Sequence, residues 1–98
     1  MQGITVVVAE PKFNLGQIVA TPGALELLSD DPHTGAAYIR RHVTGDWGVL
    51  DDEDKQENDF SVENGFRILS AYMVGTRKLW VITEADRSVT TLLLPEEY

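Results

Sequence analysis

The stretch from Gly65 to Tyr98, GFRILSAYMVGTRKLWVITEADRSVTTLLLPEEY, decides the fold that this sequence predicts. Three apolar runs follow one another within it, at residues 66–74, 79–83 and 89–94. The two-residue turn Gly75-Thr76 separates the first two runs, and the charged corner 84–88 separates the last two. Because short turns force consecutive strands to pair, residues 66–95 are predicted to form an antiparallel meander whose strand order follows the chain.

The meander has a period-two pattern, since successive side chains of a strand point to opposite sides of a sheet. In the first run one face would hold Phe66, Ile68, Ser70, Tyr72 and Val74, and the other Leu69, Ala71 and Met73. Both faces are largely apolar, so either the chain covers both of them, or helices cover one face and a partner covers the other. In so small a chain, the second apolar face favours a homo-oligomer, with a homodimer as the simplest form.

The residues before the meander predict helices, because they contain residues that begin and end helices. Thr21-Pro22 is a helix start: the threonine can accept hydrogen bonds from free N–H groups, and proline suits the first helical position. Thr34 can cap a second helix that runs through His42. Asp51 can cap a third helix, which Asn64-Gly65 ends.

The predicted fold is α+β in a single domain of residues 1–98, with N-terminal helices packed on one face of a three- to four-stranded antiparallel sheet. Residues 13–20 are the candidate for the fourth strand, with Gly16 as a bend. Residues 1–12 form an N-terminal strand or arm in this prediction, because Ile4–Val8 is a β-branched run. That run would pair either within its own sheet or with a second copy across a two-fold axis.

Length and composition bound the class of protein. The 98 residues suffice for one core, and 43% hydrophobic with 24% charged residues is a globular composition. The sequence has no cysteine, which excludes a disulfide framework and a thiolate metal site. No apolar run approaches the roughly 18 residues of a membrane span. We therefore expect a cytoplasmic protein that does not enter a membrane.

The chain is acidic: 16 acids against eight bases give a net charge of −8. Direct nucleic-acid binding is disfavoured, because phosphates are bound mainly by Lys and Arg. Eight of the acids lie within residues 46–63, where Lys55 is the only base. Either this segment keeps the protein in solution, or it mimics nucleic acid and binds a basic partner. The predicted partner-binding residues are Trp47, Asp51, Asp52, Asp54 and Glu57.

Three segments carry a resemblance to a known family: RHVTGDWG at 41–48, RILSAY at 67–72 and WVITEADRSVTTLLLPEEY at 80–98. On these motifs the chain resembles a family of short uncharacterised bacterial proteins that occur in plasmid- and phage-rich genomes. The resemblance covers about residues 13–98. The resemblance implies an origin in mobile elements and implies no particular activity.

His42 and Asp46 stand four residues apart, which would place an imidazole beside a carboxylate if the helix continues. Such a pair supports general base chemistry or half of a metal site; alternatively, His42 closes the helix and Asp46 caps the next turn. A metal would need further ligands that the sequence does not offer, so no metal and no cofactor is predicted. Trp47 is either a core anchor or an exposed aromatic for a partner.

A second candidate site centres on Arg87, in the corner Asp86-Arg87-Ser88. The corner is either a solvated turn or, with Thr83, Thr90 and His42, a phosphate-binding site. The leading hypothesis is a small acidic accessory or interaction protein without catalysis, whose partner is another protein or itself. The alternative is a metal-independent, ribonuclease-like or other phosphate-handling enzyme that uses His42 and Arg87.

Overall fold

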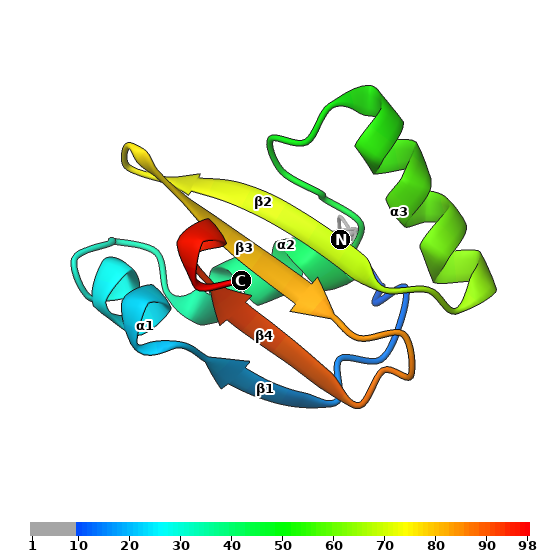
Figure 1. The fold of residues 1–98 in the computed structure, drawn as a ribbon, viewed down its shortest axis with the longest axis horizontal. Coiled ribbons are helices and arrows are strands. Elements are labelled where there is room, and N and C mark those ends of the chain that lie inside the picture. The colour runs from blue at the N-terminus through cyan, green and yellow to red at the C-terminus, as the bar shows by residue number, and fades with distance from the viewer. Residues whose placement is uncertain (1–9) are drawn as a thin grey trace, which may run out of the picture.

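The computed structural model describes residues 10–98 (Figure 1). Along the chain it forms β1 (Gln17–Ala20), α1 (Pro22–Ser29), α2 (Gly35–Val43), α3 (Asp52–Asn64), β2 (Ile68–Val74), β3 (Arg77–Thr83), β4 (Val89–Leu93) and the short 3-10 helix η1 (Pro95–Glu97). The predicted α+β class is confirmed. The β-branched run Ile4–Val8, predicted to be a strand or arm, lies outside the described residues.

The sheet is mixed, which corrects the prediction of a purely antiparallel one. The meander itself is confirmed, because β2 pairs antiparallel with β3, and β3 with β4. The fourth strand, β1, pairs with β4 but runs parallel to it, so the strand order is β1-β4-β3-β2. β1 enters the sheet beside Ser88 and leaves it beside Leu92, in the direction in which β4 runs. It also precedes all three helices, which therefore lie between strands along the chain.

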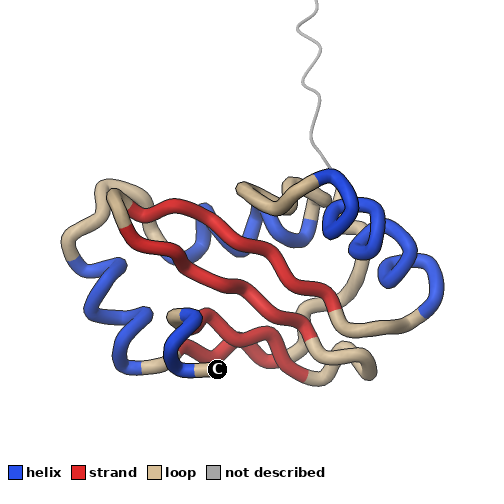
Figure 2. The backbone as a smooth tube through the Cα atoms, turned by 45° about the horizontal axis from the view of Figure 1, so that its top comes forward, coloured by secondary structure: helices blue, strands red, loops and turns tan. Residues whose placement is uncertain are grey.

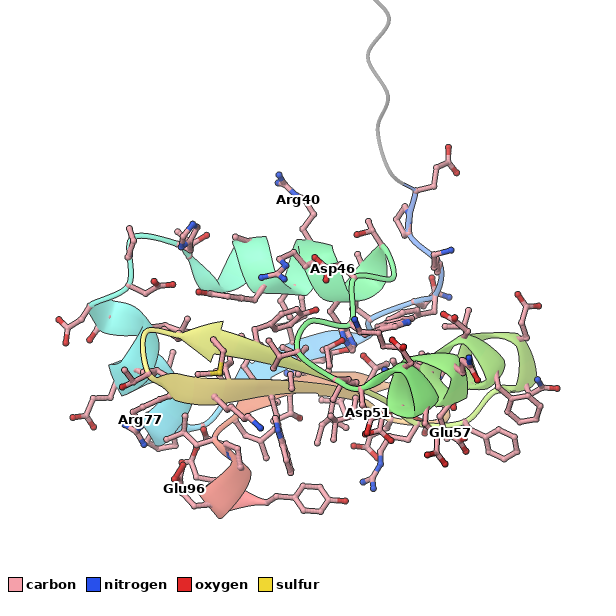
Figure 3. All side chains as sticks on the ribbon, turned by 90° about the horizontal axis from the view of Figure 1, so that it is seen from above. Arg40, Asp46, Asp51, Glu57, Arg77 and Glu96 are labelled. Atoms are coloured by element: carbon pink, nitrogen blue, oxygen red, sulfur yellow. The ribbon has the colours of Figure 1, made fainter. Side chains whose placement is uncertain are left out.

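The core lies between one face of the sheet and the helices α1 and α2. It joins apolar side chains of β2, β3 and β4 to those of the two helices: Tyr72, Val74, Leu79, Val81, Leu92, Ala24, Tyr38 and Ile39. Figure 3 shows α2 on this side of the sheet and η1 on the other. α1 and α3 lie at opposite ends of the molecule (Figures 1 and 2). Phe66, predicted to lie in the first meander strand on the same face as Ile68, precedes β2 and is 55% exposed.

Thr21 and Asp51 cap α1 and α3 as the sequence predicts, whereas Thr34 precedes α2 without a side-chain capping bond. The Thr21 hydroxyl oxygen accepts a hydrogen bond from the N–H of Ala24 at 3.2 Å, and Asp51 accepts one from the N–H of Asp54 at 2.8 Å. Gly65 ends α3 in the left-handed conformation, with φ of +74°, which glycine adopts without steric cost. Backbone groups at these helix ends are thus satisfied by the residues that the sequence places there.

The outer edge of β2 is closed by two other segments of the chain. The N–H of Val49 donates to the carbonyl oxygen of Ala71 at 2.8 Å, and the N–H of Ala71 donates to that of Trp47 at 3.2 Å. The side-chain amide of Asn58, in α3, bonds both the N–H and the C=O of Leu69, at 3.2 and 2.7 Å. The backbone groups with which a further strand would pair are therefore occupied along this part of the edge.

Gly48 lets the segment 47–49 approach β2, and its substitution tests this closure. Its φ is +80°, and a Cβ at this position would overlap the carbonyl oxygen of Ala71. Gly75 also has a positive φ, +62°, yet a Cβ there meets nothing within 4 Å. We expect Gly48→Ala to lower the free energy of unfolding by at least about 3 kcal/mol, and Gly75→Ala by only about 1 kcal/mol, because only the first adds a clash to the cost of positive φ. Urea unfolding measures both; equal losses would show that the segment is not held against β2.

Candidate functional site

His42, the first catalytic candidate in the sequence, is buried in a chain of hydrogen bonds. Its Nδ1 lies 2.6 Å from Ser70 Oγ, and its Nε2 lies 2.9 Å from Thr83 Oγ1. Thr83 Oγ1 lies 2.6 Å from Thr90 Oγ1, which donates to the backbone oxygen of Leu15 at 2.7 Å. The chain of bonds therefore connects α2, three adjacent strands and the segment that leads into β1.

The last bond sets the direction of all the others. Because Thr90 gives its only hydroxyl proton to Leu15, its oxygen must accept from Thr83. Thr83 then has no proton left for His42, so its oxygen accepts the Nε2–H of the ring. Nε2 of His42 therefore carries a proton, and in the neutral ring its Nδ1 accepts from the hydroxyl of Ser70.

Burial lowers the pKa of His42 to about 4, because a low-dielectric core disfavours the imidazolium. The residue is 0% exposed. The rings of Phe13 and Trp47 pack against the imidazole, with centroids 5.2 and 6.0 Å away. A neutral imidazole that is closed off from solvent and bonded at both nitrogens cannot take a proton from a substrate.

Asp46, the other half of the predicted pair, is bonded to Arg41 and not to His42. Arg41 Nε donates to Asp46 Oδ2 at 2.7 Å, and the N–H of Gly48 donates to Asp46 Oδ1 at 3.1 Å. The hydrogen bond from Arg41 lowers the pKa of this carboxyl. Because α2 ends at Val43, Asp46 is not on the helix and serves the turn that leads to β2.

Arg87, the second catalytic candidate, holds the backbone of three segments together. Its Nη1 donates to the carbonyl oxygens of Phe66 at 2.7 Å and Glu84 at 3.1 Å, and its Nη2 donates to that of Ser61 at 3.0 Å. The guanidinium carbon also lies 5.6 Å from the ring centre of Phe13. Arg87 has φ of +60°, a conformation that residues other than glycine rarely adopt. Both terminal nitrogens of Arg87 therefore donate to backbone carbonyls, where a phosphate was predicted.

Trp47, predicted as either a core anchor or a partner residue, is a core residue. It is 4% exposed, and its Nε1–H donates to Asp59 Oδ1 at 3.0 Å. Its ring stacks with that of Phe13, with centroids 6.3 Å apart. Trp47 therefore offers no surface to a partner, which corrects its place among the predicted partner-binding residues.

The predicted acidic residues lie on or beside α3 and are exposed (Figure 3). Asp51 caps the helix, while Asp52, Asp54 and Glu57 follow within its first two turns. Asp54 and Glu57 also line a cleft of about 480 Å³ next to α3, which we call the α3 cleft. Its other lining residues are the apolar Val49, Leu50, Leu69, Ala71 and Trp80, the polar Asn58 and Ser61, and the basic Arg67 and Lys78.

A pair of exposed aromatic rings at the end of α3 was not predicted as a site from the sequence. Phe60 and Phe66 are 56% and 55% exposed, and their rings stack with centroids 5.9 Å apart. Both line a second hollow of about 470 Å³, which shares Glu57, Ser61 and Arg67 with the α3 cleft. A signal was present in the sequence, because the two residues stand on either side of the helix stop Asn64-Gly65, where the chain reverses.

Comparisons with known proteins return nothing: no family model matches the chain, and searches of curated proteins and of solved structures find no match either. Within residues 10–98, no helix is long and apolar enough to cross a membrane. The same residues contain no cluster of three or more His, Asp or Glu side chains arranged to hold a metal ion. Function is therefore inferred from the geometry of the described surface.

The neutral state of His42 predicts stability that is sensitive to acid. Its folded pKa of about 4 lies below the ordinary value of 6.5, so the unfolded chain binds the proton more readily. This contribution, about 3 kcal/mol in full, is present above the unfolded pKa and is lost as the pH falls through the folded pKa. We expect His42→Gln, which keeps a donor and an acceptor but takes no proton, to remove this part of the pH dependence, measured by urea unfolding between the two pKa values.

His33→Gln is the matched control for this measurement, because the side chain of His33 is 68% exposed in the loop between α1 and α2. It should keep the wild-type dependence of unfolding free energy on pH. A His42→Gln variant whose stability falls with acid as steeply as that of the wild type would contradict a buried, neutral imidazole.

The bonds of Arg87 predict a structural role that lysine cannot fill. Lysine keeps the positive charge but does not present forked donors to several carbonyl oxygens. We expect Arg87→Lys to lower the free energy of unfolding by about 2 kcal/mol, the range for hydrogen bonds from charged donors. Arg77→Lys is the control and should change stability little. The side chain of Arg77 is 54% exposed, and its ion pair with Glu96 is long, at 3.6 Å, and open to solvent. Equal midpoints in urea for the two variants would count against this role.

Proposed function

We propose that this protein acts without catalysis, by binding a basic protein partner on the α3 side of the molecule. The observation that carries the proposal is the exposed, stacked pair Phe60 and Phe66, in a hollow that Glu57 also lines. Large apolar side chains are costly to leave in water, and a contiguous exposed group of them marks interaction sites. Aromatic residues are also the commonest anchors of protein–protein interfaces.

The charge distribution supports a basic partner. Residues 46–64 hold eight acids and one base, a net charge of −7, whereas the rest of the chain holds eight acids and seven bases. Nearly the whole net charge therefore belongs to α3 and the loop before it. A field of this sign attracts a basic surface and speeds its association.

The α3 cleft supports a partner that brings apolar side chains along with its basic ones. The cleft combines the carboxylates of Asp54 and Glu57 and the cations of Arg67 and Lys78 with the ring of Trp80, and Val49 in its lining is 52% exposed. An interface of this composition has an apolar centre and a charged rim. A basic segment with apolar side chains at intervals fits both the cleft and the neighbouring aromatic pair.

The mean density of carboxylates along α3 supports a partner that otherwise binds a phosphate backbone. α3 carries six carboxylates in 13 residues. At about 1.5 Å per residue, this is one carboxylate per about 3 Å of helix. Phosphates along one strand of DNA are about 3.4 Å apart. In this proposal the acidic helix replaces nucleic acid on the basic surface of the partner.

The internal bonds of His42 and Arg87 support a role without catalysis. The alternative, a phosphate-handling enzyme, needs both side chains to reach one substrate, whereas His42 is buried and Arg87 donates to backbone carbonyls. Two predictions from the sequence remain part of the proposal. The chain would belong to the bacterial family from plasmid- and phage-rich genomes, and it would be located in the cytoplasm.

The test is capture of partners from a bacterial lysate by the immobilised full-length chain, followed by calorimetry with the purified captured protein. We expect the wild type to capture a basic protein, and excess DNA to displace it. The double variant Phe60→Ser, Phe66→Ser should bind that protein at least about tenfold more weakly, because it loses both aromatic anchors.

Met73→Ser is the matched control, since it removes an exposed apolar side chain from the end of β2 that lies away from Phe66. It should bind the captured protein as the wild type does. Unchanged affinity of the double variant, or a wild-type chain that captures no basic protein, would rule out the proposed site.

A further inference from the structure

We infer that β1 is a dimerisation edge: two copies of the chain pair their β1 strands antiparallel across a two-fold axis and form one continuous sheet. The inference is independent of the proposed function, because it concerns the opposite edge of the sheet. It rests on the open backbone of β1, on an apolar groove beside that strand, and on the distribution of charge over the molecule.

β1 is an edge strand whose outward backbone groups face no other strand of residues 10–98. The N–H of Gln17 donates to the carbonyl oxygen of Ser88, and the N–H of Thr21 donates to that of Leu92. Since peptide groups alternate in direction along a strand, those of Ile18 and Ala20 face away from β4. The other edge of the sheet, by contrast, is closed by the segment 47–49 and by α3.

β1 is short, with four residues, but it contains no charge, proline or bulge that would keep an edge strand from pairing. Edge strands are commonly protected by a charged side chain, a proline or a bulge. The strand Gln17–Ala20 reads QIVA, with no charge and no proline, and pairs with β4 in an unbroken register. It is therefore able to accept a further strand.

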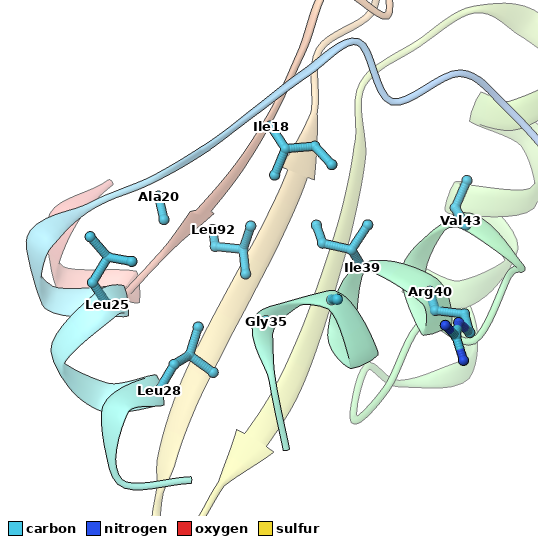
Figure 4. Close-up of a pocket in the computed structure, with 10 residues that line it drawn as sticks. Ile18, Ala20, Leu25, Leu28, Gly35, Ile39, Arg40, Val43 and Leu92 are labelled. Atoms are coloured by element: carbon cyan, nitrogen blue, oxygen red, sulfur yellow. The ribbon is translucent and has the colours of Figure 1, made fainter. Parts of the chain in front are cut away.

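An apolar groove of about 590 Å³ lies beside β1, between α1 and α2 (Figure 4). Arg40 is the one charged residue of its lining. Most of the lining is aliphatic: Ile18, Ala20, Leu25, Leu28, Ile39, Val43 and Leu92. Ile18 and Leu25 are 51% and 59% exposed. Covering these side chains would remove apolar surface from water at a small cost in desolvated charge.

The charge distribution favours the β1 edge over the β2 edge for pairing with a second copy. Two chains of net charge −8 repel each other, and the repulsion is weakest when the charges are far apart. The acidic helix α3 lies beside β2, at the edge of the sheet opposite β1 (Figure 1). Pairing through β1 therefore leaves the two acidic helices at the two ends of the dimer, with only Arg40 charged along the groove.

Two-fold symmetry determines the register. Because the peptide groups of Ile18 and Ala20 point outward, Ile18 forms a hydrogen-bonded pair with Ala20 of the second copy, and Val19 lies on the axis opposite its own counterpart. Opposed residues share a face of the sheet, so each Ile18 lies beside the groove of the other copy. The Val19 pair is of the non-hydrogen-bonded kind, with Cα atoms about 4.5 Å apart.

The lack of cysteine in the chain gives a direct test of this register. The expected Cα separation at Val19 falls within the range of about 4.4–6.8 Å that a disulfide spans. We expect the full-length Val19→Cys variant to form a covalent dimer in a glutathione redox buffer at least about tenfold faster than Met73→Cys, since pairing raises the effective thiol concentration. Met73 is the control because it is 42% exposed and lies in the edge strand β2.

Sedimentation of the full-length chain gives a second, independent readout. The wild type should sediment as a dimer of the 10.9 kDa chain at micromolar concentration. Ile18→Lys should convert it to a folded monomer, whereas Val49→Lys, an exposed position beside α3, should leave the dimer intact. A monomeric wild type, equal cross-linking rates, or a dimer that dissociates when residues 1–9 are removed would overturn the inference, the last by making the N-terminal segment the occupant of the edge.

Discussion

The hydrogen bonds that run from Ser70 through His42, Thr83 and Thr90 to Leu15 are the constraint on which the packing of this protein depends. All four side chains are buried, and a polar group left unpaired in a core costs about 1–3 kcal/mol. Each hydroxyl has one proton to give, so the bonds are satisfied only when every group is in place. The requirement holds α2, the three meander strands and the entry to β1 in one arrangement. Within residues 10–98, every buried side-chain nitrogen and oxygen has a partner.

Local signals in the sequence were sufficient for the elements but not for one strand pairing. The turn at Gly75-Thr76 and the corner at 84–88 predicted the meander, and the caps Thr21 and Asp51 predicted two helix starts, all confirmed. The parallel pair of β1 and β4 escaped prediction, because no turn connects the two strands. Its direction depends on where three helices return the chain to the sheet, which no short stretch of sequence encodes.

The candidate site was predictable as residue types and not as contacts. One hydroxyl stands at an inward position of each meander strand, in Ser70, Thr83 and Thr90, and this pattern calls for a buried polar partner. The structural role of Arg87 depends on hydrogen bonds to backbone carbonyls and on a positive φ, and neither can be predicted from residue type. The exposure of Phe60 follows from Asn58: the amide must face β2 to bond Leu69, and two residues further along a helix is about 200° around it.

The parallel pairing of β1 with β4 has a consequence for the order in which the chain is made. The pair joins Gln17 to Val89, close to the two ends of the described chain. The ribosome synthesises β1 first and its one partner strand last, with several seconds between them at about 5–20 residues per second. Closing so long a loop also costs chain entropy, which local contacts do not offset early in folding. The four-stranded sheet therefore cannot assemble before β4 has been synthesised, and until then β1 has no partner strand among residues 10–98.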